Sequence, residues 1–79
     1  MKNYIYKVWF FVEDNEITKQ FNDEMEVSSD SIYSARLKAL SRISNEFGLD
    51  VKYVSVMEFY STDNALLARY EDGWEVYPT

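Results

Sequence analysis

The chain has 79 residues, a length at which one hydrophobic core is all that the fold can enclose, so we expect a single domain over residues 1–79. Hydrophobic residues make up 47% and aromatic residues 18% of the chain, which excludes intrinsic disorder. Eight Lys and Arg against 14 Asp and Glu give a net charge of -6, which argues against direct nucleic-acid binding, and the lack of His and Cys excludes disulfides, thiolate nucleophiles and imidazole catalysis.

Two strands are predicted at the N-terminal end. Residues 3–12 are dense in β-branched and aromatic side chains, and residues 17–27 alternate between apolar and polar ones. The polar residues 13–16 between them have hairpin length, so we expect antiparallel neighbours with Val12 opposite Ile17. We interpret residues 13–16 as a solvated turn rather than a metal site, because the calcium-loop spacing with its central Gly is missing.

An amphipathic helix is predicted next. Residues 28–31 offer several N-caps, residues 32–47 carry apolar side chains at helical spacing, and Gly48 is the expected stop. Arg36 falls inside the apolar stripe. Two interpretations remain open: its stem packs on the sheet while the guanidinium pairs at the sheet rim, or the cation contacts a partner or an anion. The apolar face of the helix consists of Ile32, Ala35, Ala39, Leu40, Ile43 and Phe47.

The rest of the chain predicts a three-stranded meander over residues 51–61, 65–71 and 74–77. Asp63-Asn64 and Asp72-Gly73 are the turn signals. If the first of these is a two-residue loop, Glu58 falls opposite Arg69 and the two can form a cross-strand ion pair. The expected fold class is α+β: an antiparallel sheet of four to five strands, in the order β-β-α-β-β-β, with one amphipathic helix on one face.

One helix covers only one face of a sheet, so strand alternation assigns each side chain to a covered or an uncovered face. The expected core side chains of the strands are Tyr4, Tyr6, Val8, Phe10, Phe21, Met25, Tyr53, Met57, Phe59, Leu66, Ala68 and Tyr70. The uncovered face then receives Ile5, Lys7, Trp9, Phe11, Val54, Val56, Glu58, Tyr60, Leu67, Arg69, Trp74 and Val76. Soluble monomers rarely leave so large an apolar patch in water, so we expect a second copy or another protein to cover it.

The candidate partner-binding residues follow from this face and from the charge distribution. Trp, Tyr and Phe most often anchor protein interfaces. Residues 31–47 carry an excess of two positive charges, which leaves a net charge of -8 on the rest of the chain and favours a basic protein partner. The alternative for the acidic residues is a solvated, solubilising surface. The candidates are Trp9, Phe11, Tyr60 and Trp74 as anchors, with Arg36, Glu13, Asp14, Glu71 and Asp72 as charged contacts.

The residue inventory also argues against catalysis. Ser hydroxyls are present without a His to activate them, and only Gly48 and Gly73 are available for a phosphate loop. We therefore expect no enzyme activity, no cofactor and no metal. Because no export signal is visible and the apolar run 8–12 is far too short to span a bilayer, we expect a cytoplasmic protein without membrane contact.

Several segments together resemble small phage-encoded anti-CRISPR and related anti-defence inhibitors. They are Glu26-Val27-Ser28-Ser29 leading into a helix with Ala35 and Ala39 four apart, then Val56-Met57-Glu58, the strand 67–70 and a closing Glu71-Asp72-Gly73-Trp74 hairpin. This resemblance implies a non-enzymatic phage protein that binds a host or defence effector in the host cytoplasm and blocks it. No binding residue of such a family is transferred to this chain.

Two functional hypotheses result. The first is a protein-binding inhibitor or regulator, which uses the exposed aromatic sheet face and its acidic loops against a host effector. The alternative is a homodimeric structural or accessory module without catalytic activity, whose uncovered face is consumed by a second copy.

Overall fold

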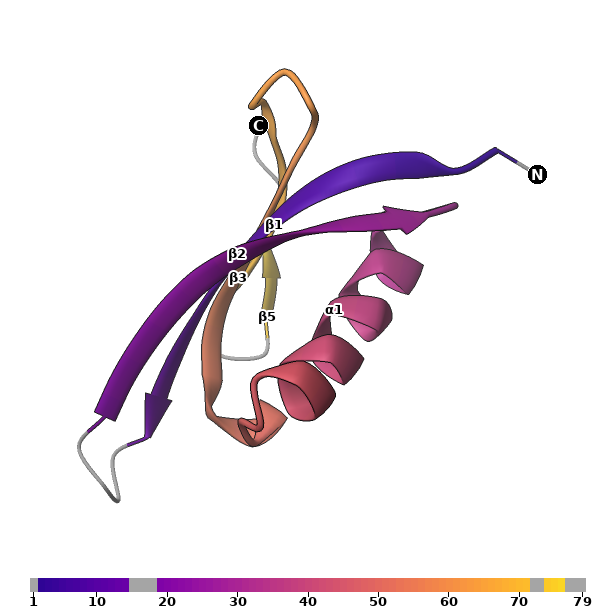
Figure 1. The fold of residues 1–79 in the computed structure, drawn as a ribbon. Helices are drawn as coiled ribbons and strands as arrows, with labels where there is room; N and C mark the ends of the chain where they lie inside the picture. The colour runs from indigo at the N-terminus through magenta and orange to yellow at the C-terminus, as the bar shows by residue number, and fades with distance from the viewer. Residues whose placement is uncertain (1, 15–18, 72–73, 77–79) are drawn as a thin grey trace.

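The computed structural model describes residues 2–14, 19–71 and 74–76 of the chain (Figure 1). It contains an α-helix and an antiparallel sheet, so the predicted α+β class is confirmed. The elements are β1 (Tyr4–Asp14), β2 (Lys19–Ser29), α1 (Ile32–Glu46), a 3-10 turn η1 (Val51–Tyr53), β3 (Val54–Tyr60), β4 (Leu66–Glu71) and β5 (Trp74–Val76).

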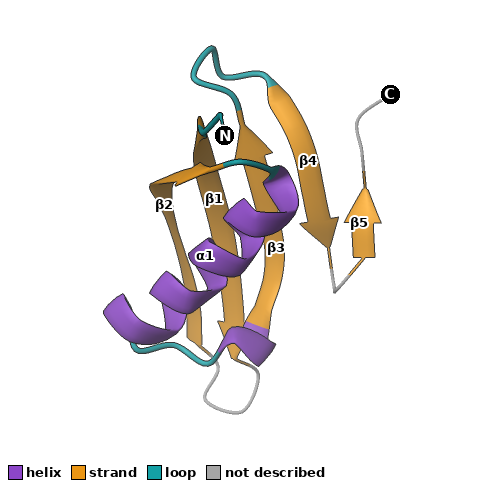
Figure 2. Ribbon diagram, turned by 90° about the vertical axis from the view of Figure 1, so that its right-hand side faces the viewer, coloured by secondary structure: helices purple, strands orange, loops and turns teal. Residues whose placement is uncertain are grey.

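The five strands lie in the order β2-β1-β3-β4-β5, and every neighbouring pair is antiparallel. The N-terminal strand is therefore the second strand of the sheet, between the two partners β2 and β3. The last three strands form the predicted meander. Figure 2 shows α1 lying across one face of the sheet, in front of β2, β1 and β3.

The hydrophobic core lies between α1 and this covered face. Ala35, Ala39 and Ile43 of the helix are fully buried, and the two small alanines let the helix approach the sheet closely. Ile32, Leu40 and Phe47 pack around them, as the helical periodicity predicted. The strands contribute the buried hydrophobic side chains Tyr6, Val8, Phe10, Val12, Met25, Val27, Met57, Phe59, Ala68 and Tyr70.

The helix begins at the predicted residue and ends close to the predicted one. The Ser31 hydroxyl accepts a hydrogen bond from the Ser34 backbone N–H at 3.1 Å, which makes Ser31 the N-cap. Gly48 follows the helix with φ of 66°, a conformation that glycine adopts without a Cβ clash. The helix ends at Glu46, one residue before the predicted end at Phe47.

Two expected core residues are more exposed than predicted: Tyr4 keeps 48% and Phe21 40% of its area accessible. Their strands have 11 residues each and α1 has 15, which correspond to lengths of about 36 Å and about 22 Å. The helix is therefore too short to cover both strand ends. Phe21 still contacts the rim of the core, with its ring centroid 6.1 Å from that of Phe10.

The predicted register of the first hairpin is wrong by four residues. Val12 pairs with Phe21 instead of Ile17, because β1 continues through Glu13 and Asp14. These polar residues pair with Gln20 and Lys19, and the Gln20 amide donates to the Glu13 carboxylate at 3.4 Å. A shift of four residues is even, so it leaves every side chain on its predicted face.

Two β-bulges correct the predicted faces of individual residues. The first, between Phe11 and Val12, pairs Val12 with Val54, so Val54 packs on the core instead of facing away. The second lies between Phe59 and Tyr60 and places Leu67 against the core, while Leu66 is 36% exposed. Leu66 and Leu67 thus exchange the positions that simple alternation predicted.

Two further local predictions need correction. Residues 51–53 form η1 rather than the start of a strand, because the Asp50 carboxylate accepts from the Lys52 backbone N–H at 3.0 Å and closes a turn. The β3–β4 loop is longer than two residues, with Ser61 N–H bonded to the Ala65 carbonyl at 2.9 Å. Tyr53 accordingly lies beside the core rather than within a strand.

Two basic residues of α1, Lys38 and Arg42, lie along the outer edge of β2. The Lys38 ammonium donates to the Ser28 carbonyl at 2.8 Å, and the Arg42 guanidinium donates to the Glu26 carbonyl at 2.7 Å. The Glu24 backbone N–H donates to the Asp23 carboxylate at 2.7 Å. An edge strand whose backbone groups are already bonded is a poor template for a further strand, so these side chains protect the sheet from extension at β2.

Candidate functional site

The sheet face opposite α1 is the candidate interaction surface, and no helix or strand among the described residues packs over it (Figures 1 and 2). We call it the open face. Backbone register arranges its side chains in rows across the strands. It comprises Ile5, Lys7, Trp9 and Phe11 from β1, Asn22, Glu24, Glu26 and Ser28 from β2, Val56, Glu58 and Tyr60 from β3, and Arg69 and Glu71 from β4.

The apolar centre of the open face is built on β1. Trp9 and Phe11 are two residues apart and therefore point to the same side of the strand. Their rings stack with centroids 6.4 Å apart and planes inclined by 21°. Val56 lies directly across from Phe11 on β3. All three side chains are half-buried, because neighbours on the same face shield them even without a covering element.

A polar row crosses the sheet beside Trp9. The register runs from Glu24 through Trp9 and Glu58 to Arg69. The predicted cross-strand ion pair is present, with Arg69 Nε 3.4 Å from Glu58 Oε2. The Nε–H makes no hydrogen bond with described residues, so the interaction is electrostatic rather than directional. Arg69 Nη2 also lies 3.7 Å from Glu71 Oε1.

Tyr60 is tied into this row by its hydroxyl, which donates to Glu58 Oε1 at 2.7 Å. This hydrogen bond to Glu58 raises the pKa of the Tyr60 phenol above its usual value of 10.0, and burial and the Glu58 charge act in the same direction. This hydrogen bond exists only while the Tyr60 phenol is protonated, because the phenol is the donor. Its contribution to stability is therefore complete below about pH 10 and is lost as the pH rises through the folded-state pKa.

We expect Tyr60→Phe to lower the free energy of unfolding by about 1 kcal/mol at pH 7, because it removes a partly exposed hydrogen bond to a charged group. The difference from wild type should shrink above pH 10, where the wild-type phenol ionises and loses the same bond. Urea unfolding of both proteins at pH 7, 9 and 11 measures this. A difference that stays constant up to pH 11 would contradict the assigned role of the bond.

The open face is acidic at its β2 side. It carries four carboxylates, Glu24, Glu26, Glu58 and Glu71, against the two cations Lys7 and Arg69, an excess of two negative charges. The Lys7 ammonium donates to the Asn64 side-chain oxygen at 3.0 Å. A shallow depression of about 340 Å³ lies here, lined by Lys7, Trp9, Glu24, Glu58, Tyr60 and Asn64.

The predicted partner-binding residues do not all share one surface. Trp9, Phe11, Tyr60 and Glu71 belong to the open face. Arg36 and Glu13 both line a groove between α1 and the start of β3, and Asp14 ends β1. The Trp74 backbone pairs with Glu71. The Trp74 side chain and Asp72 lie outside the described part of the structure.

Glu24 was missed among the candidates, although it is the direct neighbour of Trp9 on β2. The predicted hairpin register would have put Gln20 in this position. The correct pairing depends on β1 extending to Asp14, and the polar character of residues 13 and 14 hides this extension in the sequence. The sequence signals for this extension were two polar cross-strand pairs, Glu13 with Gln20 and Asp14 with Lys19.

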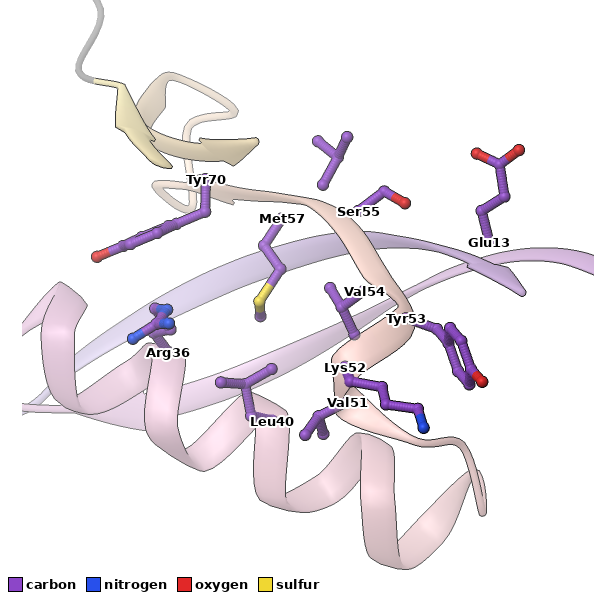
Figure 3. A pocket seen from close by; sticks show the side chains of 11 residues that line it. Glu13, Arg36, Leu40, Val51, Lys52, Tyr53, Val54, Ser55, Met57 and Tyr70 are labelled. Carbon is purple, nitrogen blue, oxygen red and sulfur yellow. The ribbon is translucent and has the colours of Figure 1, made fainter. Parts of the chain in front are cut away.

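The second concave region is a groove between α1 and the start of β3, where β3 runs past the last residue that β4 pairs with it (Figure 3). Its volume is about 640 Å³. Arg36 and Tyr70 lie at one end and Lys52 and Tyr53 at the other, with apolar side chains between them. We call this region the helix–sheet groove.

Comparisons with known proteins do not place the chain in a family. No family model matches it, and no curated protein or solved structure is similar enough to count as a match. Within the described residues, no helix is both long and apolar enough to cross a bilayer. The same residues contain no group of three Asp, Glu, His or Cys side chains arranged to hold a metal ion.

Proposed function

We propose that the chain is a non-enzymatic protein-binding module that docks a basic protein surface on its open face. The observation that carries this proposal is the stacked Trp9–Phe11 pair on a sheet face without a covering element among the described residues, bordered by carboxylates. Half-buried aromatic side chains surrounded by polar groups have the anatomy of a protein interface, with an apolar centre and a polar rim. On the resemblance to anti-defence inhibitors, the partner is a host or defence effector and the outcome is inhibition.

The charge of the open face favours a different protein, rather than a second copy of this chain, as the partner that binds there. Two open faces packed on each other would bring the carboxylates of Glu24, Glu26 and Glu71 against an equally acidic surface. Like charges opposed across an interface cost several kcal/mol. A basic partner gains from the same carboxylates through faster association and better complementarity. Homodimerisation is therefore the second candidate, and sedimentation analysis separates the two.

The proposal predicts that Glu24→Lys weakens binding to the partner, because it reverses a rim charge beside Trp9. The partner is first isolated by affinity capture from a lysate of cells that produce the chain. The dissociation constant of the captured protein is then measured at low salt and at a salt concentration several times higher. We expect a loss of about tenfold at low salt that shrinks at high salt, because salt screens the exposed charge.

Glu46→Lys is the matched control. It makes the same change of charge on α1, on the other side of the molecule, and breaks only the exposed ion pair with Arg42. It should bind like wild type. Equal capture of one protein by wild type and both variants would refute the open face as the interface. A dimer in sedimentation analysis that dissociates on Trp9→Ala would instead assign the face to a second copy.

A further inference from the structure

The helix–sheet groove lies between α1 and the start of β3. Val56 lines it and also belongs to the open face, but Arg36, Leu40, Val54 and Met57 do not belong to that face and take no part in the proposed protein docking. Leu40 from α1 and Val54 and Met57 from β3 line its middle (Figure 3). Its volume of about 640 Å³ falls in the range of small-molecule sites, which is roughly 300–1,000 Å³. Apolar side chains in the middle and charged groups at the ends give such a groove the means to bind a ligand that has an apolar part and a charged part.

Arg36 supplies the polar group at one end. Its guanidinium lies over the Tyr70 ring, with Cζ 4.8 Å from the ring centroid, and this cation–π contact holds the planar group at the mouth of the groove. No described carboxylate lies within ion-pair distance of Arg36. The two other arginines are paired, Arg42 with Glu46 and Arg69 with Glu58. Of the two interpretations that the sequence left open, pairing of Arg36 at the sheet rim is not seen among the described residues.

We propose that the helix–sheet groove binds a small organic anion that carries an aliphatic tail. The carboxylate would accept hydrogen bonds from the Arg36 guanidinium, which presents its donors in a planar fork that matches a carboxylate. The tail would lie along Leu40, Val54 and Met57, where it displaces water from apolar surface. Lys52, at the far end, is paired with Asp50 at 3.6 Å, so Arg36 is the cation that selects the charge of the ligand.

Octanoate and 1-octanol are the probes, because they share an aliphatic tail and differ in the charged group. Binding is measured by isothermal titration calorimetry and by the NMR shift of the Met57 methyl group. We expect saturable one-to-one binding of octanoate. In Arg36→Met, which keeps an apolar stem, octanoate affinity should fall by about tenfold or more, the loss of a charge-assisted hydrogen bond. Octanol should bind more weakly than octanoate to wild type and equally to both proteins.

Arg42→Met is the matched control, since it removes an arginine from the outer side of the same helix. It should leave octanoate affinity unchanged. Arg36→Lys keeps a cation at the site and should recover part of the octanoate affinity. Such a recovery would show that the loss in Arg36→Met comes from the missing charge and not from misfolding. Equal octanoate affinity in wild type and Arg36→Met, octanol binding as tightly as octanoate, or no saturable octanoate binding would each overturn the proposal. None of these results bears on the open face.

Discussion

Phe10→Ala should lower the free energy of unfolding by about 3–5 kcal/mol, the cost of removing a fully buried aromatic side chain and leaving a cavity. Phe10 lies on β1, and its ring meets that of Phe47 edge-on at 5.3 Å and that of Phe21 at 6.1 Å. A chain of this length has a total stability of roughly 4–12 kcal/mol. Urea denaturation followed by far-UV circular dichroism should therefore show an unfolding midpoint shifted to much lower urea, because the substitution removes a large part of this total.

Phe21→Ala is the control for this prediction, because it is the same substitution in a ring of the same cluster. Phe21 is 40% exposed, so little cavity forms when its ring is removed, and we expect a loss of about 1–2 kcal/mol. Equal losses for the two variants would show that the core does not extend between α1 and β1 as described.

Trp9→Ala should weaken binding to the protein partner by about 30-fold or more. This corresponds to a loss of about 2 kcal/mol or more in binding free energy, which is typical when a central aromatic side chain is removed from an interface. Trp9 stacks on Phe11 and stands between Glu24 and Glu58 in the row that crosses the open face. The unfolding free energy should fall by only about 1–2 kcal/mol, since the side chain is half-buried in the free protein. Affinity is measured by calorimetry with the captured partner.

Tyr33→Ala is the matched variant, because Tyr33 is an aromatic residue on α1 and is 66% exposed. It should change neither affinity nor stability by more than about 0.5 kcal/mol. Loss of binding in both variants would point to a general effect of surface aromatics. Unchanged binding in Trp9→Ala would remove the open face from the proposed function.

The face of the sheet on which each side chain lies was largely predictable, because successive side chains of a strand point to opposite faces. Tyr6, Val8 and Phe10 lie toward α1, and Trp9 and Phe11 lie away from it, as predicted. A hairpin register that is wrong by four residues did not disturb this assignment, since an even shift preserves the face of every side chain. It did change the neighbours. The error hid Glu24, and with it the acidic border of the candidate site.

Residues that depart from alternation could not be predicted in the same way. Val54, Leu66 and Leu67 lie next to bulges, where one extra residue reverses the face of the neighbouring side chains. A bulge depends on how two strands and the helix pack together, so neighbouring residues in the sequence do not reveal it. Asp50 shows the opposite case, because a carboxylate that bonds the backbone two residues on is a local turn signal.

The sequence by itself determined the α+β class, the helix between the capping residues 28–31 and Gly48, and the face of the sheet on which the β1 side chains lie. These features depend on residues close together in the chain, on periodicity, caps and turns. The tertiary structure alone decided that β1 lies between β2 and β3 and that Arg36 stands in a groove over Tyr70 rather than on the aromatic face. Strand order and the position of a helix across a sheet are set by the summed packing of distant segments, which no local pattern contains.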